Sequence, residues 1–552
     1  MLAIVALALG VSTMTHAAPL TVKTEQGKVR GKTINDGKVQ AFLGLPYAAP
    51  PVGDLRWRAP QPPAKREGER DATSFGAHCA QNRIWDDFIF LDSGASEDCL
   101  FLNVYAPAVS NANSKLPVML WIHGGGYAAG ASSEPRHNGD FLPLKGVVLV
   151  TINYRLGVFG FLATSDLAHE ANGAAGNYGL QDMVAALEWV KANVRNFGGD
   201  PGNVTIFGES AGSFAVSTLM ASPAARGLFH RAIGESGAAF GDTLSADTLE
   251  AREKKDGEWV ASLGVKSLEE LRAVPTGKIL DAVKSRGIIG FSPVIDGKLL
   301  VEPVAGAYAA GKQAHVPLLA GWNRDEGRSR VNEMTAEKWK AYAEEHYKER
   351  SAEFLKLYPA DTDAQALRSA IDYGGDAFIA FGTWKWIEAQ RNTGAPTDRS
   401  SSVGWQAGAP TDRASSVGGQ AGAPTDRSSS VGGQTGDSPV YRYRFDLASP
   451  PSKFHLGSFA FHSDDIEYVF GTLDTRPGAV WRPEDRKLRE QMMSYWTNFA
   501  RTGDPNGTGL PPWPKYDSAD SLIHLDSTIT SGPDTLRPRY EFLLKGMPPF
   551  HF

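Results

Sequence analysis

The chain has few cysteines, no dominant charge and, beyond its N-terminal segment, no long apolar run. Its 62 acidic and 56 basic residues leave a net charge of −6 over 552 residues, with both signs mixed. This balance argues against a nucleic acid as partner, because nucleic-acid binding needs clustered positive charge. No run of 18 apolar residues follows the N-terminal segment, so we expect no membrane span. With 42% hydrophobic residues, the chain can nevertheless bury a large core.

The first 17 residues are typical of a secretory signal. Residues 2–9 are apolar, and small residues follow them as far as Ala17 and Ala18. We expect cleavage near these alanines, which leaves residues 18–552 as a single domain in the periplasm or outside the cell. The segment lacks lysine and arginine, so either translation starts upstream or the α-amino group supplies its only positive charge.

A nucleophile motif lies near the middle of the chain. Residues 207–212 read Phe-Gly-Glu-Ser-Ala-Gly and directly follow the apolar run 204–206. A strand that ends here, a sharp turn at Ser210 and a helix from Ala211 would raise the serine hydroxyl above a sheet. The two glycines allow the crowded turn. Because the chain has 59 glycines, composition alone gives about half a chance match to G-x-S-x-G, so the motif needs support from elsewhere.

A run of three glycines supplies the first support. Residues 116–122 are apolar and fit a buried strand, and His123 and the glycines 124–126 follow directly. Consecutive glycines leave backbone N–H groups free to approach a substrate oxygen closely. The run therefore predicts an oxyanion hole, to which the N–H of Ala211 would contribute. The alternative is a flexible turn between a strand and a loop.

The acid and the base should follow the serine in the order acid, then histidine. Asp325 and Glu326 come directly after the apolar run 316–321, and both are candidates for the carboxylate. Among the 12 histidines, His462 lies in a polar loop between apolar segments. His455 comes seven residues earlier, and spacing does not exclude it.

These motifs together resemble the type-B carboxylesterases, which share the α/β-hydrolase fold with the cholinesterases. The resemblance runs from about residue 20 to 545, apart from one insert. Further matching stretches are residues 42–48, 51–57, 97–104, 153–155, 176–182 and 197–201. The resemblance implies a central, mostly parallel sheet flanked by helices, with inserts that form an active-site gorge.

The resemblance also implies a role for each site residue. Ser210 would be the nucleophile, Glu326 rather than Asp325 the acid, and His462 the base. Such a triad hydrolyses esters through an acyl-enzyme and requires no metal or cofactor. It implies as oxyanion donors the backbone N–H groups of Gly125, Gly126 and Ala211.

The two cysteines point to an exported protein with one disulfide. An even count in an oxidising compartment suggests that Cys79 and Cys99 are bonded, and the resembled family has a bridge at this place. The cholinesterases carry a cation-binding tryptophan in the loop that this bridge closes. Here the loop is shorter and Trp85 does not fall at the matching spacing, so we expect it to anchor the packing of the loop.

The family suggests two further features, and helical spacing predicts two helices. Ser236 would have a supporting polar role near the triad, with a simple turn serine as the alternative. Arg56 and Glu97 would form a structural ion pair. Apolar residues at helical spacing predict helices over 180–194 and 488–499.

Residues 394–435 hold three nearly unchanged copies of a 14-residue unit. The unit is rich in glycine, serine, threonine and alanine and has almost no apolar face. It cannot offset its own ordering entropy, so we expect a disordered insert. Without it, Thr393 would join Gly436 in a short turn between a helix at 381–390 and a strand at 440–445. We interpret the repeats as a tandem duplication in a surface loop.

The sequence therefore predicts a serine carboxylesterase that acts on small-molecule esters. Two alternatives remain. One is a specialised esterase for a toxin, a polyester or a bulky natural product. The other is a binding member of the same fold that has lost catalysis, although such members typically lack a triad residue.

Overall fold

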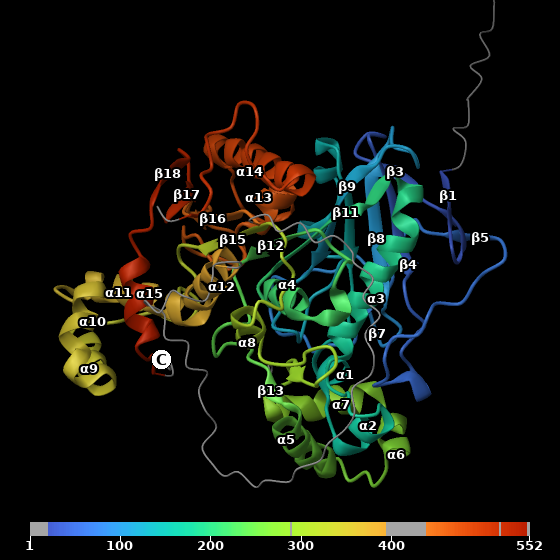
Figure 1. Cartoon of the computed structure of the whole chain (residues 1–552), viewed down its shortest axis with the longest axis horizontal. Coiled ribbons are helices and arrows are strands. Elements are labelled where there is room, and N and C mark those ends of the chain that lie inside the picture. Colours follow the sequence, from blue (N-terminus) through green and yellow to red (C-terminus); the bar gives the residue numbers. More distant parts are fainter. Residues whose placement is uncertain (1–19, 288–289, 393–437, 518–519, 549–552) are drawn as a thin grey trace, which may run out of the picture.

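The computed structural model describes residues 20–287, 290–392, 438–517 and 520–548. The expected signal (residues 1–17) and the repeat insert (residues 394–435) lie outside these ranges. Within them, one sheet of 11 strands forms the centre of the molecule (Figure 1). No described helix has the length and apolarity needed to cross a membrane.

Seven adjacent strands of the large sheet run parallel, and antiparallel strands lie at both edges. In spatial order the parallel strands are β17 (Ser521–Leu525), β16 (Val440–Phe445), β15 (Leu318–Asn323), β12 (Arg231–Glu235), β11 (Gly199–Glu209), β9 (Leu116–Ile122) and β10 (Val148–Ile152). The antiparallel strands are β18 (Thr530–Pro533) beside β17, and β8 (Phe101–Pro107), β4 (Val39–Pro46) and β3 (Lys32–Ile34) beyond β10. This topology confirms the expected central, mostly parallel sheet.

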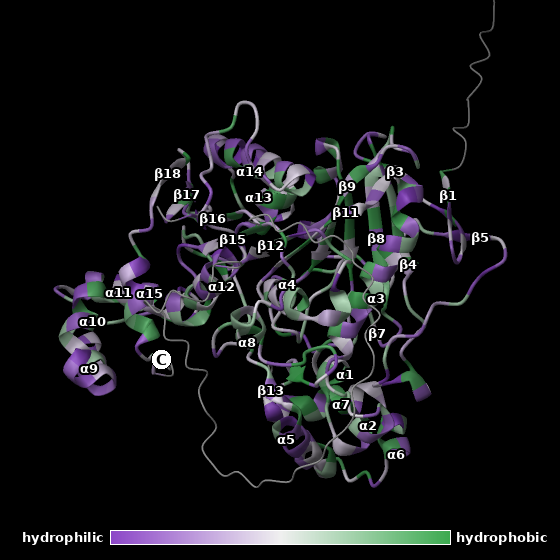
Figure 2. Ribbon diagram, viewed as in Figure 1, coloured by the Kyte–Doolittle hydropathy of each residue, from purple (hydrophilic) through white to green (hydrophobic). Residues whose placement is uncertain are grey.

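The side chains of the central strands alternate between two cores, one on each face of the sheet. In β9, Val118 and Leu120 belong to one core, and Met119 and Trp121 belong to the other. Successive side chains of a strand point to opposite faces, so a sheet covered on both faces requires strands that are apolar throughout. Figure 2 shows hydrophobic residues concentrated in these strands.

Helices cover both faces of the sheet. One core includes residues of α3 (Tyr178–Asn193), α4 (Ala211–Ala221) and α12 (Phe381–Arg391). The other includes residues of α13 (Ile466–Phe470) and α14 (Pro483–Thr502). Figure 1 shows α13 and α14 on the opposite side of the sheet from α4 and α12. The expected helices at 180–194 and 488–499 are thus present as α3 and α14.

Two groups of helices are inserted between the strands. One comprises α5 (Leu249–Ser262), α6 (Leu268–Ala273) and α7 (Thr276–Val283), and the other α9 (Ala336–Tyr347), α10 (Ser351–Leu357) and α11 (Asp363–Gly375). Between α11 and α12 the chain forms a π-helical turn, Asp376–Ala380. Such turns occur frequently at functional sites.

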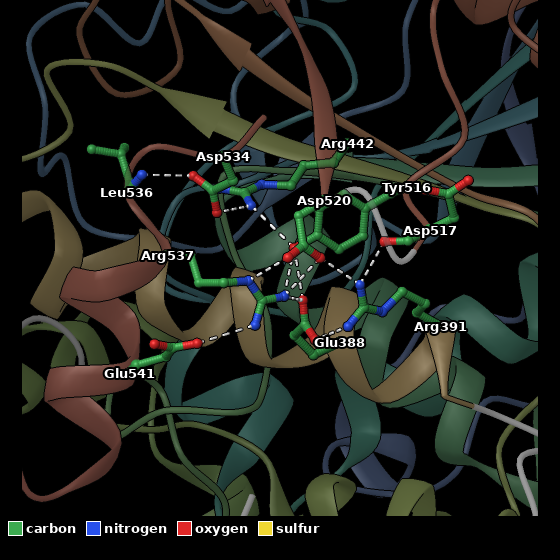
Figure 3. A network of polar contacts seen from close by, with 10 residues as sticks. All are labelled: Glu388, Arg391, Arg442, Tyr516, Asp517, Asp520, Asp534, Leu536, Arg537 and Glu541. Atoms are coloured by element: carbon green, nitrogen blue, oxygen red, sulfur yellow. Dashed lines mark hydrogen bonds and ion pairs between the residues drawn. The ribbon is translucent and has the colours of Figure 1, made fainter. Parts of the chain in front are cut away.

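Polar contacts fix the chain on both sides of the repeat insert (Figure 3). Arg391, at the end of α12, donates to the carbonyl of Asp517 at 2.7 Å and to the carboxylate of Asp520 at 2.6 Å. On the other side, the N–H of Tyr516 donates to the carbonyl of Val440 at 2.8 Å, at the start of β16. Because Tyr516 and Asp517 are neighbours, the same short segment holds both sides of the insert. Arg391 and Val440, which flank the insert in the described part of the chain, are therefore held close to one segment.

Deleting residues 394–435 is expected to leave the domain folded and active. The contacts that fix Arg391 and Val440 do not involve the insert, and the entropy of closing a loop depends only logarithmically on its length. The free energy of unfolding should change by no more than about 2 kcal/mol. Urea unfolding and ester hydrolysis, compared with those of the full chain, measure this. A deletion variant that is insoluble, or soluble and inactive, would contradict the interpretation as a tandem duplication.

Candidate active site

Ser210 lies at a sharp turn between β11 and α4. It has a φ of 53° and a ψ of −124°, a conformation that costs energy for any residue other than glycine. The N–H of Ser210 donates to the carbonyl of Glu235 on the neighbouring strand at 2.9 Å, which stabilises the turn. A methyl group on Gly212 would lie 1.9 Å from the carbonyl oxygen of Ile122, and one on Gly208 would lie 2.6 Å from it. Both glycines of the motif are therefore required by the close approach of β9.

Ser210, His462 and Glu326 form one hydrogen-bonded chain. The Nε2 atom of His462 lies 2.8 Å from the Oγ atom of Ser210, and its Nδ1 atom lies 2.6 Å from the Oε2 atom of Glu326. The other carboxylate oxygen of Glu326 accepts the N–H of Asn323 at 2.8 Å. The side-chain NH₂ of Asn323 also donates to the carbonyl of Phe461 at 2.6 Å. The end of β15 thus orients both Glu326 and the loop that carries His462.

The two residues that the sequence left as alternatives make other contacts, although His455 lines the same cavity as Ser210. Asp325 pairs with Arg324 and Arg368 and accepts the N–H of Ala460 at 2.9 Å. It therefore supports the backbone of the histidine loop, while the imidazole contacts its neighbour Glu326. His455 packs against Phe461, with 4.5 Å between the ring centroids.

The glycine loop packs directly against the turn at Ser210. A methyl group on Gly124 would lie 3.0 Å from the Cβ atom of Ser210. Gly125 and Gly126 have φ angles of 101° and 62°, and within the described residues their N–H groups donate to no protein acceptor. Ala211 is the first residue of α4, where a helical N–H has no partner in its own helix. Two free donors thus lie on residues that line the same cavity as Ser210, and a third lies on the residue that follows it.

Glu209 is a second carboxylate on His462, and the sequence analysis gave it no role. Its Oε1 atom lies 3.3 Å from the Nε2 atom of His462 and accepts the hydroxyl of Ser463 at 2.6 Å. Burial raises the pKa of Glu209 to about 7. Burial alone would lower the pKa of His462, but the charges of Glu209 and Glu326 raise it to about 9. The position of Glu209 beside Ser210 in the motif was the only signal in the sequence.

The replacement Glu209→Gln is expected to shift the pH dependence of ester hydrolysis towards acid. A general base acts in its neutral form, and two carboxylates hold the pKa of His462 above its ordinary value of 6.5. As the pH is lowered, activity of the wild type should therefore begin to decline at a pH above 6.5. Without the charge of Glu209, the inflection in kcat/KM should move down by about one unit or more. An unchanged inflection would contradict this account. Asp87→Asn, which removes a carboxylate from the same cavity, is the control.

A cavity of about 560 Å³ opens beside these residues. Aromatic side chains form much of its wall, namely Trp85, Phe88, Phe214, Phe378 and Phe454. Phe378 comes from the π-helical turn, and its ring centroid lies 5.3 Å from that of His462. Trp85 contacts Phe88 at 5.1 Å between centroids, but it is 36% exposed and lines the cavity, so its role as a packing anchor stays a prediction.

Two of the remaining expected contacts are found, away from the cavity beside Ser210. Cys79 and Cys99 form a disulfide. Arg56 donates to Glu97 at 2.7 Å and to the carbonyls of Arg272 and Val274. The hydroxyl of Ser236, in contrast, is buried and makes no hydrogen bond within the described residues.

The family model described as "Carboxylesterase family" matches residues 18–542. The chain belongs to the carboxylesterase family. It is therefore a carboxylic-ester hydrolase, as predicted. Para-nitrobenzyl esterase of Bacillus subtilis is 35% identical over 557 residues, which cover 97% of this chain and all of that protein. The fumonisin B1 esterase of Sphingopyxis macrogoltabida is 32% identical over 542 residues, which cover 96% of this chain and 90% of that protein.

Solved carboxylesterases have the same fold. A para-nitrobenzyl (PNB) esterase superposes with a TM-score of 0.75 at 32% identity, over 95% of this chain and 99% of the other. A carboxylesterase of Geobacillus stearothermophilus gives a TM-score of 0.76 at 29% identity, with the same coverage. These superpositions confirm the predicted α/β-hydrolase fold.

Proposed function

We propose that this carboxylesterase acts through Ser210 as nucleophile, His462 as general base and Glu326 as the carboxylate that orients the base. One observation carries the proposal: the unbroken hydrogen-bonded chain from Ser210 through the imidazole to Glu326. A serine hydroxyl is a weak nucleophile, and a neighbouring base activates it by removing its proton as the attack proceeds. The buried carboxylate then stabilises the imidazolium that forms.

The reaction proceeds in two halves. The Oγ atom of Ser210 attacks the ester carbonyl while His462 takes the hydroxyl proton. The tetrahedral intermediate collapses, the alcohol leaves with that proton, and the acyl group remains on the serine. Water then gives a proton to His462 and attacks the acyl-enzyme. The bond between the acyl carbon and Oγ of Ser210 breaks, His462 returns the proton to Oγ, and the acid is released.

The backbone N–H groups of Gly125, Gly126 and Ala211 would stabilise the oxyanion of each tetrahedral intermediate. The support is that Gly125 and Gly126 line the same cavity as Ser210, that Ala211 directly follows it, and that these N–H groups donate to no protein acceptor within the described residues. Removing one such donor in other enzymes costs about 3–4 kcal/mol of transition-state stabilisation. Because the donors belong to the backbone, they are held in place before the substrate binds.

A fluorophosphonate that traps the nucleophile tests the assignment. It should inactivate the enzyme after incorporation of one equivalent, and mass spectrometry should find the adduct on the peptide that contains Ser210. Labelling of another residue, or no labelling of the folded protein, would overturn the assignment and favour the binding-only alternative.

The substrate range is expected to centre on short and medium acyl chains. A cavity of about 560 Å³ is the size of a pocket for a small organic ligand. A series of p-nitrophenyl esters from acetate to palmitate measures this range. The second candidate is a specialised esterase for a toxin, and the relative named fumonisin B1 esterase supports it. Activity on that compound with poor activity across the simple series would favour it.

The protein is also proposed to be exported, with residues 1–17 as the signal. The disulfide between Cys79 and Cys99 supports this, because disulfides persist in oxidising compartments. Protein recovered from outside the cytoplasm should begin at residue 18 or 19. Intact mass measurement checks this, and an exported protein that retains residues 1–17 would contradict it.

A further inference from the structure

Three arginines line the cavity beside Ser210, and two of them are neutralised. Arg136 pairs with Glu134 at 2.8 Å. Arg476 pairs with Asp464 and with Glu467, each at 2.7 Å. The charges of these two arginines are taken up by the protein itself.

The third arginine, Arg330, has no carboxylate within ion-pair distance in the part of the chain that the structure describes. It lies on the loop that follows β15 and carries Glu326, and its side chain is exposed to the cavity. The guanidinium lies over the ring of Phe378, 4.0 Å from the centroid. An arginine stacked in this way keeps its planar edge of N–H donors free. One aromatic ring thus separates an unpaired cation from the imidazole of His462.

The pKa shifts of the three arginines show the same difference between the two paired arginines and Arg330. Burial would lower the pKa of Arg136 and Arg476, but their carboxylate partners raise it above the ordinary value. Burial also lowers the pKa of Arg330, and here no carboxylate offsets it. The guanidinium of Arg330 therefore lacks the stabilising anion that the other two already have.

Arg328, on the same loop, has a structural role and serves as a comparison. Arg328 donates to the carbonyl of Val331 at 2.7 Å and lies over the ring of Phe459, and it does not line the cavity. Its donors are used by the chain, whereas those of Arg330 face the space in which the substrate binds.

We propose that Arg330 binds a carboxylate carried by the ester substrate, so that the enzyme prefers esters with a free carboxylate at one end. The proposal rests on the proposed function of Ser210. The preference depends on position, because the other two arginines that line the cavity are already paired with carboxylates, and a substrate carboxylate placed beside Asp87 or Glu209 would meet negative charge. Charge-assisted hydrogen bonds from arginine to a carboxylate are strong and specific in geometry.

Two pairs of substrates of matched shape test the proposal. Benzyl hydrogen adipate and benzyl hexanoate differ by a carboxylate on the acyl side. 4-Butyryloxybenzoate and 4-butyryloxybenzamide differ by a carboxylate on the leaving group. The ratio of kcat/KM between charged and neutral members is measured for the wild type, for Arg330→Gln and Arg330→Lys, and for Arg328→Gln as the matched control.

We expect the wild type to favour the charged member of at least one pair. In Arg330→Gln, kcat/KM for that member should fall by about 10- to 100-fold, and that for its neutral partner by less than about threefold. Arg330→Lys should retain part of the preference, and Arg328→Gln should retain all of it. An equal loss for both members would show a structural role and overturn the proposal.

The wild type alone keeps the proposal testable if the variants do not fold. A preference for the neutral member in both pairs overturns it. A preference for a charged member that declines as salt is added supports it, because salt screens charges exposed to solvent. Loss of the proposed function is seen separately: Ser210→Ala would then hydrolyse the neutral esters as fast as the wild type.

Discussion

Replacing Ser210 with alanine is expected to lower kcat for a p-nitrophenyl ester on the order of 10⁶-fold, the effect of removing the nucleophile from a serine hydrolase. Alanine removes only the Oγ atom that lies 2.8 Å from His462, and it fits the space that serine leaves. The cavity and the free donors of the glycine loop remain. Any residual rate should therefore reflect binding and the oxyanion donors alone.

Ser236 offers a matched control for this replacement. It follows β12 as Ser210 follows β11, and the two residues have nearly equal φ angles of 56° and 53°. The hydroxyl of Ser236 makes no hydrogen bond within the described residues, so Ser236→Ala should change kcat less than about tenfold. Initial rates are compared at equal concentrations of protein shown to be folded by circular dichroism. An inactive Ser236→Ala, or an active Ser210→Ala, would contradict the assignment of Ser210 as the nucleophile.

The sequence predicted the strands and turns of the site well because these depend on local patterns. The apolar run before Ser210 is the end of β11, and much of the crowding that its two glycines relieve comes from the end of β9. The strand at 440–445 is found with the same bounds as β16. Both predictions used local patterns: an apolar run that ends at glycines before Ser210, and a run of β-branched and aromatic residues interrupted by Arg442 and Arg444 in β16.

What the sequence did not predict depends on residues that meet only in the fold. Glu209 approaches His462 across 253 positions of sequence, and no spacing rule reaches so far. Phe378 enters the cavity because a π-helical turn shifts the helical register between α11 and α12, which periodicity at 3.6 residues does not reveal. Arg330 differs from the other arginines of the cavity because no carboxylate of the described residues pairs with it. The sequence cannot show this, since ion pairs between distant residues form only in the fold.

The choice between Asp325 and Glu326 makes the strongest test of the geometry, because the two carboxylates are adjacent and both are buried. Glu326→Gln is expected to lower kcat by about 10⁴-fold with little change in KM. The N–H of Asn323 donates to one oxygen of Glu326, so a glutamine here would point its carbonyl at Asn323 and its NH₂ at His462. The imidazole would then carry its proton on Nε2, facing Ser210, and could not accept the proton of the hydroxyl.

Asp325→Asn is the control, and its effect should appear in stability rather than in turnover. Asp325 holds Arg324, Arg368 and the N–H of Ala460, so its loss is expected to lower the free energy of unfolding by about 1–3 kcal/mol. The chain from Ser210 to Glu326 stays intact, and kcat of the folded variant should remain within about tenfold of the wild type. Urea unfolding and steady-state kinetics separate the two effects. If Asp325→Asn lost turnover on the 10⁴-fold scale while Glu326→Gln kept it, Asp325 would be the carboxylate that orients His462, and the hydrogen bond between His462 and Glu326 would have no part in catalysis.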